Sequence, residues 1–297
     1  MSSTITRQHV ASLIPQRPPD AHKGVFGHVF VVAGSPGFTG AASLACEGAL
    51  RSGAGLVTVG VPESLNPIME VKTTEAMTLP LPETGRHTLS RAAVEPAVEF
   101  AKKCSAVALG PGISRDKETE SFVHAFLKKT ELPVVVDADG LNALANDMDA
   151  IKARHAATVL TPHPGEMSRL IDKPAAEIQQ DRRGCAVEFA REWNVVLVLK
   201  GHGTVVTSPS GEALTNPTGG SGMASGGAGD ILTGLTGGLL AQGLSAWDAA
   251  VVSVYLHGLA GDIASETCTE WGMVASDIVR ALPAAWKRIA EDRDGTG

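Results

Sequence analysis

The sequence has few aromatic residues, few cysteines and no concentration of positive charge. Aromatic side chains make up 4% of the 297 residues, too few for a surface on which nucleic-acid bases stack. The formal net charge is −7 and there is no basic run, so nucleic acid and anionic membranes are poor candidate partners. The four cysteines form no C-x-x-C pair, and we expect buried, reduced thiols, as in a cytoplasmic protein.

Targeting segments and several well-known catalytic patterns are also missing. The first 24 residues contain no apolar segment of the kind found in secretory signals. The uncharged stretch between Lys23 and Glu47 is interrupted by Gly34-Ser35-Pro36-Gly37, which argues against a membrane span. The patterns H-E-x-x-H, G-x-S-x-G, G-x-G-x-x-G and Walker A do not occur. Zinc hydrolysis, a serine nucleophile and a Rossmann dinucleotide site are therefore not indicated.

What the sequence does contain is a repeated alternation of apolar, β-branched runs with longer helical patterns. Continuous apolar runs are typical of parallel strands covered on both faces, so the alternation predicts a doubly wound α/β layer fold. The predicted strands are Val29–Ala33, Leu56–Val61, Ala106–Leu109, Val134–Asp137, Thr158–Leu160 and Val195–Leu199. The predicted helices between them cover about 39–53, 90–103, 116–129, 140–149 and 174–191.

The pattern changes near residue 195, where short strands separated by glycine turns predict an antiparallel addition to the sheet. These strands are Val195–Lys200, Thr204–Ser208 and Glu212–Thr215. Three closing helices are predicted at about 229–242, 245–267 and 275–291. Since no long linker or repeat is present, we expect one catalytic domain over residues 23–291, an N-terminal extension over 1–22 and a frayed tail over 292–297.

A glycine-rich segment from Asn216 to Asp230 leads into one of these helices. The N–H groups and the positive dipole end of a helix start bind phosphate well. The carboxylate of Asp230 could accept a proton from a substrate hydroxyl there, and the dipole should keep it ionised near neutral pH. A tight turn with Asp230 as a helix cap is the alternative, although so many glycines are costly without a ligand.

Other polar residues follow predicted strands, at the edge where open α/β sheets bind ligands. Asp137, Asp139 and Asn142 could hold Mg²⁺ through water, or could cap the next helix. His163 stands between two prolines and could contact a ligand or be structural. Glu166 could be a water-mediated metal ligand or a carboxylate at a helix start.

Three loops have the form of ligand-binding turns. In the Lys200–Thr204 turn, glycines allow a phosphate or base to approach the backbone, and Lys200 could pair with an anion; a simple hairpin turn is the alternative. The loop Gly34–Ala41 would suit a ligand or a plain strand–helix connection equally well, and the turn Leu109–Gly112 lies at the carboxyl end of a predicted strand, where open α/β sheets bind ligands.

Taken in order, these motifs resemble the ADP/ATP-dependent NAD(P)H-hydrate dehydratases, a family with the ribokinase-like fold. The resemblance extends over about residues 20–285 and includes Lys23–His28 and Leu50–Val57. It implies a three-layer α/β/α sandwich with a mostly parallel central sheet and an antiparallel extension. It also implies a reaction, in which a nucleotide is spent to remove the water added at C6 of the nicotinamide ring of NADH or NADPH.

The resemblance further implies a role for each candidate residue, with Asp230 as the base at the substrate hydroxyl. The hydrated cofactor would contact Ala41, Gly112, His163 and Asp230. The adenine nucleotide would contact Lys200, Gly201, His202, Gly203, Thr204 and Gly229. The main-chain N–H groups of Gly227, Ala228 and Gly229 would hold the transferred phosphoryl group. Mg²⁺ and ADP are the implied cofactor and co-substrate, and a cytoplasmic homotetramer the implied state.

Two departures from the family pattern stand out. Ala228 replaces the Thr or Ser that commonly precedes the Gly-Asp pair, so a hydroxyl contact is lost while the main-chain N–H groups remain. About 23 residues precede the first motif, so we expect no epimerase activity of the kind that some members carry. The alternative functions are a small-molecule kinase of the same fold, acting on a vitamin-precursor alcohol, and a non-catalytic nucleotide sensor.

Overall fold

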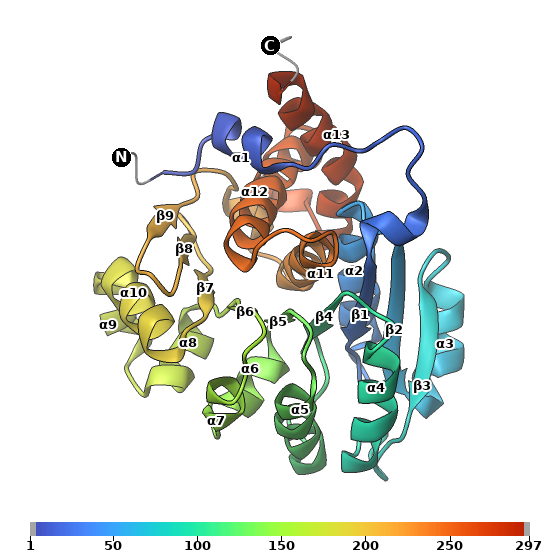
Figure 1. The fold of residues 1–297 in the computed structure, drawn as a ribbon. Coiled ribbons are helices and arrows are strands. Elements are labelled where there is room, and N and C mark those ends of the chain that lie inside the picture. Colours follow the sequence, from blue (N-terminus) through green and yellow to red (C-terminus); the bar gives the residue numbers. More distant parts are fainter. Residues whose placement is uncertain (1–3, 294–297) are drawn as a thin grey trace.

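The continuous apolar runs form the parallel centre of the sheet. The computed structural model describes residues 4–293, whose nine-stranded sheet has the order β3-β2-β1-β4-β5-β6-β7-β8-β9 (Figure 1). The strands from β3 to β7 pair in parallel, and β8 and β9 extend the sheet antiparallel. The strands are β1 His28–Val32, β2 Leu56–Pro62, β3 Met77–Leu81, β4 Ala106–Leu109, β5 Val134–Val136, β6 Thr158–Leu160, β7 Val196–Leu199, β8 Val205–Thr207 and β9 Ala213–Thr215.

Helices cover both faces of this sheet, which confirms the predicted three-layer architecture (Figure 1). In β1, Val29 and Val31 join the core on the side of α2, α11, α12 and α13, whereas Phe30 and Val32 join the core on the side of α4 to α10. The helices are α1 Arg7–Leu13, α2 Thr39–Arg51, α3 Asn66–Lys72, α4 Val94–Ala101, α5 Lys117–Lys129, α6 Asp139–Leu144, α7 Asp149–Lys152, α8 Pro164–Ile171, α9 Ala175–Gln180, α10 Arg182–Trp193, α11 Ala228–Ala241, α12 Ala246–Gly272 and α13 Ala275–Arg293.

Several elements differ from the sequence-based expectations. The helix expected over 174–191 is two helices, because Asp181 interrupts it and caps α10 by accepting a hydrogen bond from the Gly184 N–H at 2.8 Å. The segment 140–149 likewise contains parts of α6 and α7. Strand β3 and helices α1, α3 and α8 were not expected. Of the predicted frayed tail, residues 294–297 lie outside the described residues, and α13 continues to Arg293.

Helix α1 lies within the segment expected to be an N-terminal extension. Thr6 caps it by accepting a hydrogen bond from the His9 N–H, and Val10 is fully buried against the face that carries α12 and α13. Just before it, the Ile5 N–H donates to the carbonyl of Thr215 in β9. This stretch therefore contributes to the core beside the sheet.

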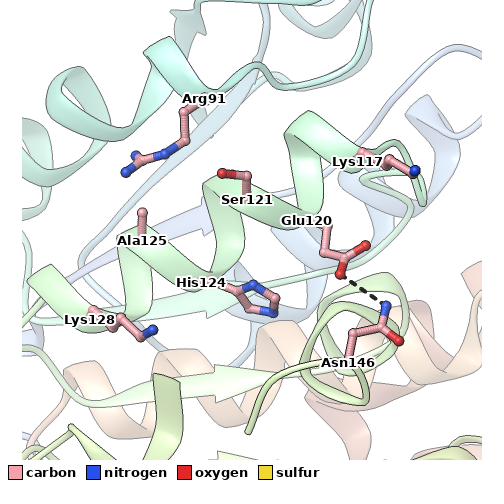
Figure 2. A pocket seen from close by; sticks show the side chains of 8 residues that line it. All are labelled: Arg91, Lys117, Glu120, Ser121, His124, Ala125, Lys128 and Asn146. Carbon is pink, nitrogen blue, oxygen red and sulfur yellow. Dashed lines mark hydrogen bonds between the residues drawn. The ribbon is translucent and has the colours of Figure 1, made fainter. Parts of the chain in front are cut away.

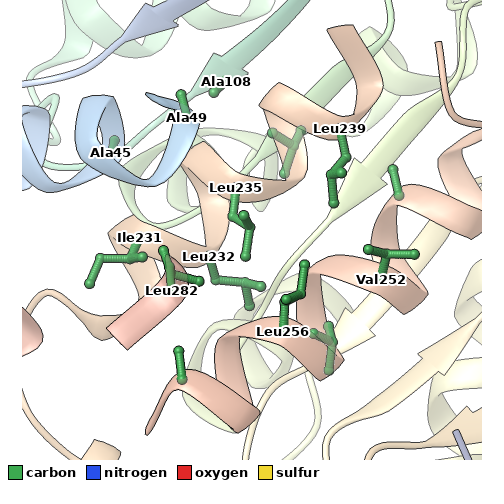
Figure 3. Packing of buried hydrophobic residues seen from close by; sticks show 14 of the residues in the cluster. Ala45, Ala49, Ala108, Ile231, Leu232, Leu235, Leu239, Val252, Leu256 and Leu282 are labelled. Atoms are coloured by element: carbon green, nitrogen blue, oxygen red, sulfur yellow. The ribbon is translucent and has the colours of Figure 1, made fainter. Parts of the chain in front are cut away.

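Helix α11 is buried between α2 and α12 (Figure 3). Glycine makes this close packing possible, since a Cβ at Gly234 would lie 1.9 Å from the carbonyl oxygen of Ala45 in α2. A Cβ at Gly48 of α2 would similarly lie 2.2 Å from the carbonyl oxygen of Ile231. Backbone thus lies directly on backbone, which fixes the start of α11 at the carboxyl edge of the sheet.

Two expectations about the whole chain can be compared with this fold. No helix in the part of the chain that the structure describes is long and apolar enough to cross a membrane. All four cysteines are free thiols, but only Cys46 and Cys104 are buried, while Cys185 and Cys268 are partly exposed. The expectation of four buried thiols was therefore wrong for the last two.

Candidate active site

A cavity of about 670 Å³ opens at the carboxyl edge of the sheet, where α11 begins. Its walls come from the loops after β5, β6 and β7, the glycine-rich segment before α11, and α12. Loops far apart in sequence meet there because parallel strands present their carboxyl ends at one edge. Of the residues predicted from the sequence, the cavity is lined by Asp137, His163, Glu166, Lys200, Gly201, His202, Thr204, Gly227, Ala228, Gly229 and Asp230.

The first turn of α11 forms one wall of the cavity. Gly227 is the residue before the helix and has φ 96°, a left-handed conformation that favours glycine. It has no side chain to cap α11, and Ala228, Gly229 and Asp230 in the first turn all line the cavity. A helix start of this kind offers main-chain N–H donors and a positive dipole end to an anion.

A partly buried lysine, whose side chain is 18% exposed, lies among carboxylates beside this turn. The Lys200 ammonium donates to Asp137 Oδ1 at 2.6 Å, and its Nζ lies 3.8 Å from Glu166 Oε2. The second oxygen of Asp137 accepts a hydrogen bond from the Thr233 hydroxyl at 2.7 Å. Burial alone would lower the pKa of Lys200, but the charges of Asp137 and Glu166 outweigh it and raise that pKa. Lys200 is therefore cationic at the cavity wall.

Asp230 has a different ionisation from the one expected from the helix dipole. Burial, followed by the nearby negative charge of Asp137, raises the pKa of Asp230 to about 7, and Lys200 opposes this only in part. The expectation of a carboxylate that is fully ionised near neutral pH was therefore wrong, because desolvation and a like charge outweigh the dipole. A carboxylate with a pKa near neutrality is well suited to accept and release a proton.

His163 has the structural role that the sequence left open, and it also lies where a ligand contact would be made. Its Nδ1 accepts hydrogen bonds from the N–H groups of Gly165 and Glu166, and the Glu166 carboxylate accepts one from the His163 N–H at 2.8 Å. The pair is thus a capping box at the start of α8. The His163 side chain nevertheless remains 51% exposed and lines the cavity, where it can also meet a ligand.

The Lys200–Thr204 turn is held from outside by Arg182 at the start of α10. The guanidinium donates to the carbonyls of Leu199, Lys200 and His202 at 2.6–3.1 Å. Three carbonyls on one planar group fix the shape of the turn. Sequence reasoning missed Arg182, because it lies in an ordinary polar helix with no motif around it.

Two of the predicted substrate contacts do not line the cavity but lie together beside it. A Cβ at Gly112 would lie 3.2 Å from that of Ala41, and the Ser35 hydroxyl donates to the Gly112 carbonyl at 2.7 Å. The same loop touches the cavity wall, since a Cβ at Gly110 would lie 2.0 Å from the carbonyl oxygen of Asp137. Gly203 also stays outside the lining, although its neighbours in the turn belong to it.

The three candidate metal-binding residues are not grouped as a metal cage. Asn142 lies outside the cavity lining, and its side-chain oxygen accepts a hydrogen bond from Arg169 while its amide donates to Asp139. Both oxygens of Asp137 already have partners. Across residues 4–293, no three His, Cys, Asp or Glu side chains gather as metal ligands would.

Sequence reasoning also missed a polar residue of α12 in the cavity wall. His257 lies in an apolar helical stretch, where a single histidine is usually structural, and the only available signal was its polarity among residues such as Leu256 and Leu259.

Another hollow of about 570 Å³ lies along the outer side of α5 (Figure 2). Its polar groups connect neighbouring elements, as Glu120 does by accepting a hydrogen bond from Asn146 at 3.0 Å.

Comparison with known proteins finds similarity to NAD(P)H-hydrate dehydratases and repair enzymes. The family model described as NAD(P)H-hydrate dehydratase matches residues 29–284. The bifunctional NAD(P)H-hydrate repair enzyme of Moorella thermoacetica is 46% identical over 97% of this chain and 54% of its own length. The ADP-dependent (S)-NAD(P)H-hydrate dehydratase of Bacillus subtilis is 34% identical over 96% of this chain and 98% of its own. The chain thus spans about half the length of the bifunctional relatives that it matches.

A solved structure agrees in fold. The ADP/ATP-dependent NAD(P)H-hydrate dehydratase of Bacillus subtilis, co-crystallised with ATP and Mg²⁺, superposes with a TM-score of 0.84 at 32% sequence identity. The match covers 97% of this chain and 99% of the other.

Proposed function

Because the chain belongs to the NAD(P)H-hydrate dehydratase family, we propose that it restores NADH and NADPH from their S-configured hydrates, using ADP and releasing AMP and phosphate. One observation carries the proposal: Asp230, the start of α11 and the Lys200–Thr204 turn line a single cavity. The reaction needs a base, a phosphate cradle and a nucleotide loop, and these three elements supply them together.

The first chemical step follows from the nature of the leaving group. Hydroxide leaves poorly, so the hydroxyl at C6 must first be phosphorylated. Asp230 takes the hydroxyl proton while the oxygen attacks the β-phosphorus of ADP, and the bond between that phosphorus and the bridging oxygen of AMP breaks. With a pKa of about 7, Asp230 is a stronger base than an ordinary aspartate and is still ionised in about half of the molecules at neutral pH.

Elimination then restores the ring. The lone pair of the ring nitrogen forms a C=N bond as the C6–O bond breaks and phosphate leaves. Loss of the C5 proton moves that pair back and forms the C5=C6 double bond of NADH. The N–H groups of Gly227, Ala228 and Gly229 hold the phosphoryl group, a role that does not need a hydroxyl at position 228.

The ligand contacts are proposed as the family pattern suggests. The adenine nucleotide contacts Lys200, Gly201, His202, Gly203, Thr204 and Gly229, and the hydrated cofactor contacts Ala41, Gly112, His163 and Asp230. The loop with Gly112 adjoins the cavity at Asp137, which supports two ligands meeting near Asp230.

Mg²⁺ is proposed to arrive with the nucleotide. The described side chains offer no cage for it, but Mg²⁺ commonly keeps several waters and binds through substrate phosphates with one or two carboxylates. Glu166 and Asp137 would hold it through water. Asn142 would not take part, because it lies outside the cavity lining and its side-chain oxygen already accepts a hydrogen bond from Arg169. The ion would neutralise phosphate charge during transfer.

We also propose a cytoplasmic homotetramer that acts on small molecules, without nucleic acid or membrane as a partner. The net charge of −7 supports the last point. At the β3 edge of the sheet, Ile68, Val71 and Met77 are exposed apolar side chains that another copy could cover. Light scattering of the purified protein measures the assembly directly.

The function is tested by incubating the protein with ADP, Mg²⁺ and hydrated NADH while NADH absorbance is followed. We expect NADH, AMP and phosphate to appear in equal amounts. A phosphorylated product that accumulates without NADH would indicate a kinase, and nucleotide binding without turnover would indicate a sensor. Turnover with ATP and none with ADP would overturn the proposed donor.

A further inference from the structure

The glycine-rich segment before α11 is joined to α12 by hydrogen bonds at its beginning. The Asn216 amide and the Thr218 hydroxyl donate to main-chain carbonyls of α12 at 3.2 and 3.0 Å. Further along α12, the carboxylate of Asp262 accepts the N–H of Gly219, with both of its oxygens 3.1 Å from that nitrogen. Asn216, Thr218 and Gly219 all line the cavity, so these bonds determine where one of its walls lies.

Residues 220–227, which we call the cavity loop, connect Gly219 to α11, and most of them line the cavity. Within the described part of the chain, their hydrogen bonds stay inside the loop or reach α11, as in the bond from the Met223 N–H to the Gly220 carbonyl at 3.2 Å. The sulfur of Met223 also packs against α12, which is an apolar contact. The bond between Gly219 and Asp262 is therefore the last hydrogen bond to α12 before the loop begins.

The glycines at the two ends of the cavity loop do not keep it in this shape by themselves. Gly219 and Gly227 both have φ 96°, and glycine can leave that conformation for others without steric cost. At the Gly227 end the helix supplies the restraint, because the Gly227 carbonyl accepts the N–H of Ile231 in α11 at 3.3 Å. At the Gly219 end the carboxylate of Asp262 supplies it.

The surroundings of Asp262 suit it to this contact. Its side chain is partly buried and lies outside the cavity lining, and among the described residues its oxygens accept hydrogen bonds only from the Gly219 N–H. The guanidinium of Arg288 pairs with Glu266, one turn further along α12, at 3.2 Å. A carboxylate holds a main-chain N–H more strongly than a neutral oxygen does. Asp262 therefore acts on the cavity through the main chain at Gly219.

We propose that Asp262 is a positioning residue: by accepting the N–H of Gly219, its carboxylate keeps the cavity loop in the shape that receives ADP. The inference rests on the proposed function and adds to it a residue that touches no ligand. The loop leads into the N–H groups of Gly227, Ala228 and Gly229, which would hold the phosphoryl group. Without the bond to Asp262, ADP must order the loop as it binds, and that requirement weakens its affinity.

Three variants separate this role from a general effect on stability. Asp262→Ala removes the acceptor, whereas Asp262→Asn keeps an oxygen that can accept the Gly219 N–H. Asp116→Ala is the matched control, because the Asp116 carboxylate also accepts a main-chain N–H, that of Glu118 at 2.9 Å. It caps α5, which packs on the opposite face of the sheet from α12. Melting temperatures of all three variants report whether the fold is intact.

Hydrogen exchange in the unliganded proteins tests the loop directly. Peptides that cover residues 220–227 should exchange at least about threefold faster in Asp262→Ala than in the wild type, because the loop opens more often. Asp262→Asn and Asp116→Ala should exchange there like the wild type. Equal exchange in the wild type and Asp262→Ala would overturn the inference. Equally fast exchange in Asp116→Ala would do so too, because it would reflect lower stability alone.

Calorimetric titration with Mg·ADP tests the consequence for the nucleotide. In Asp262→Ala we expect the Kd to rise by about three- to tenfold, whereas Asp262→Asn and Asp116→Ala should stay within about twofold of the wild type. An unchanged Kd in Asp262→Ala, or an equal rise in Asp116→Ala, would contradict the positioning role. Wild-type protein that binds no ADP would instead contradict the proposed function, and the exchange measurement would still decide whether Asp262 holds the loop.

Discussion

At the first turn of α11, the carboxylate of Asp230 lies near a lysine and two other acidic side chains, those of Asp137 and Glu166. Asp137 forms an ion pair with Lys200 and accepts a hydrogen bond from the Thr233 hydroxyl, and Glu166 accepts one from the His163 N–H at the start of α8. Asp230 has no comparable partner and bears the desolvation, which raises its pKa to about 7. The arrangement leaves Asp230 as the acid group that is free to exchange a proton with a ligand.

Replacing Asp230 by asparagine should therefore slow the reaction strongly without preventing ADP from binding. Asp230→Asn keeps the shape but removes the base, and general bases contribute about 10²–10⁴ in rate. We expect kcat to fall by at least about two orders of magnitude, with ADP affinity little changed. Steady-state kinetics and an ADP titration measure both. A variant that keeps more than a tenth of wild-type turnover would favour a purely structural Asp230.

His163 calls for a pair of variants, because its side chain caps α8 as well as lining the cavity. His163→Ala should raise the KM for the hydrate by roughly tenfold, equivalent to about 1.4 kcal/mol, and should also lose about 0.5–2 kcal/mol of stability with the cap. His163→Asn keeps a good cap and should raise KM without the loss in melting temperature. Unchanged KM in both variants would leave His163 with the capping role alone.

The candidate site could be predicted only in part from single residues. Asp230, Lys200 and Glu166 stand next to glycine or proline turns, and such turns are visible in sequence. His257 and Arg182 lie inside regular helices, so their roles depend on which loop the helix packs against. The raised pKa of Asp230 depends on its burial and on the charge of Asp137. Asp137 lies 93 residues earlier in the sequence, and only the fold brings the two side chains together.

At the scale of elements, the contact between α2 and α11 determines where the catalytic turn lies. A methyl group at Gly234 would meet the backbone of Ala45, which has no flexible end that could move aside. We expect Gly234→Ala to destabilise the protein by about 3 kcal/mol or more, at the upper end for overpacking, because α2 and α11 must separate. Denaturant unfolding measures the change.

Gly40→Ala in α2 is the control for that prediction. A Cβ there meets no atom within 4 Å, and the residue is exposed. Its effect should stay within about 1 kcal/mol, because only helix propensity changes. If Gly234→Ala were as stable as Gly40→Ala, the close backbone packing of these helices would not hold.

The burial and length of an element determine whether it can be predicted from the sequence. The parallel strands β1, β4 and β5 are buried on both faces and therefore read as unbroken apolar runs. Strand β3 lies at the edge, is partly exposed and contains Pro80, features that argue against a strand although an edge tolerates a missing N–H. Helix α1 is too short for its apolar period to be recognised.

At the scale of the whole molecule, the burial of Asp230 links activity to pH. In the free protein the base must be ionised, so kcat/KM for the hydrate should fall about tenfold per pH unit below about 7 and level off above it. A pH profile of kcat/KM measures this directly. A profile that stays flat down to pH 5 would show that a base with an ordinary carboxylate pKa, or none, is used.

Stability should change in the opposite direction over the same window. The pKa of Asp230 is about 7 in the folded protein and near 4 when unfolded, so between these values the folded state holds a proton that the unfolded state has released. Its contribution is complete below about pH 4, declines as pH rises, and is lost above about 7, a change of at most about 4 kcal/mol. Glu166 titrates in the same direction, because burial raises its pKa as well. Comparing wild type with Asp230→Asn isolates the one group: the two should melt alike near pH 4, and the variant should melt higher at pH 8, where it no longer buries a charge. A difference in melting temperature that does not vary with pH would contradict the raised pKa and, with it, the base that the proposed reaction requires.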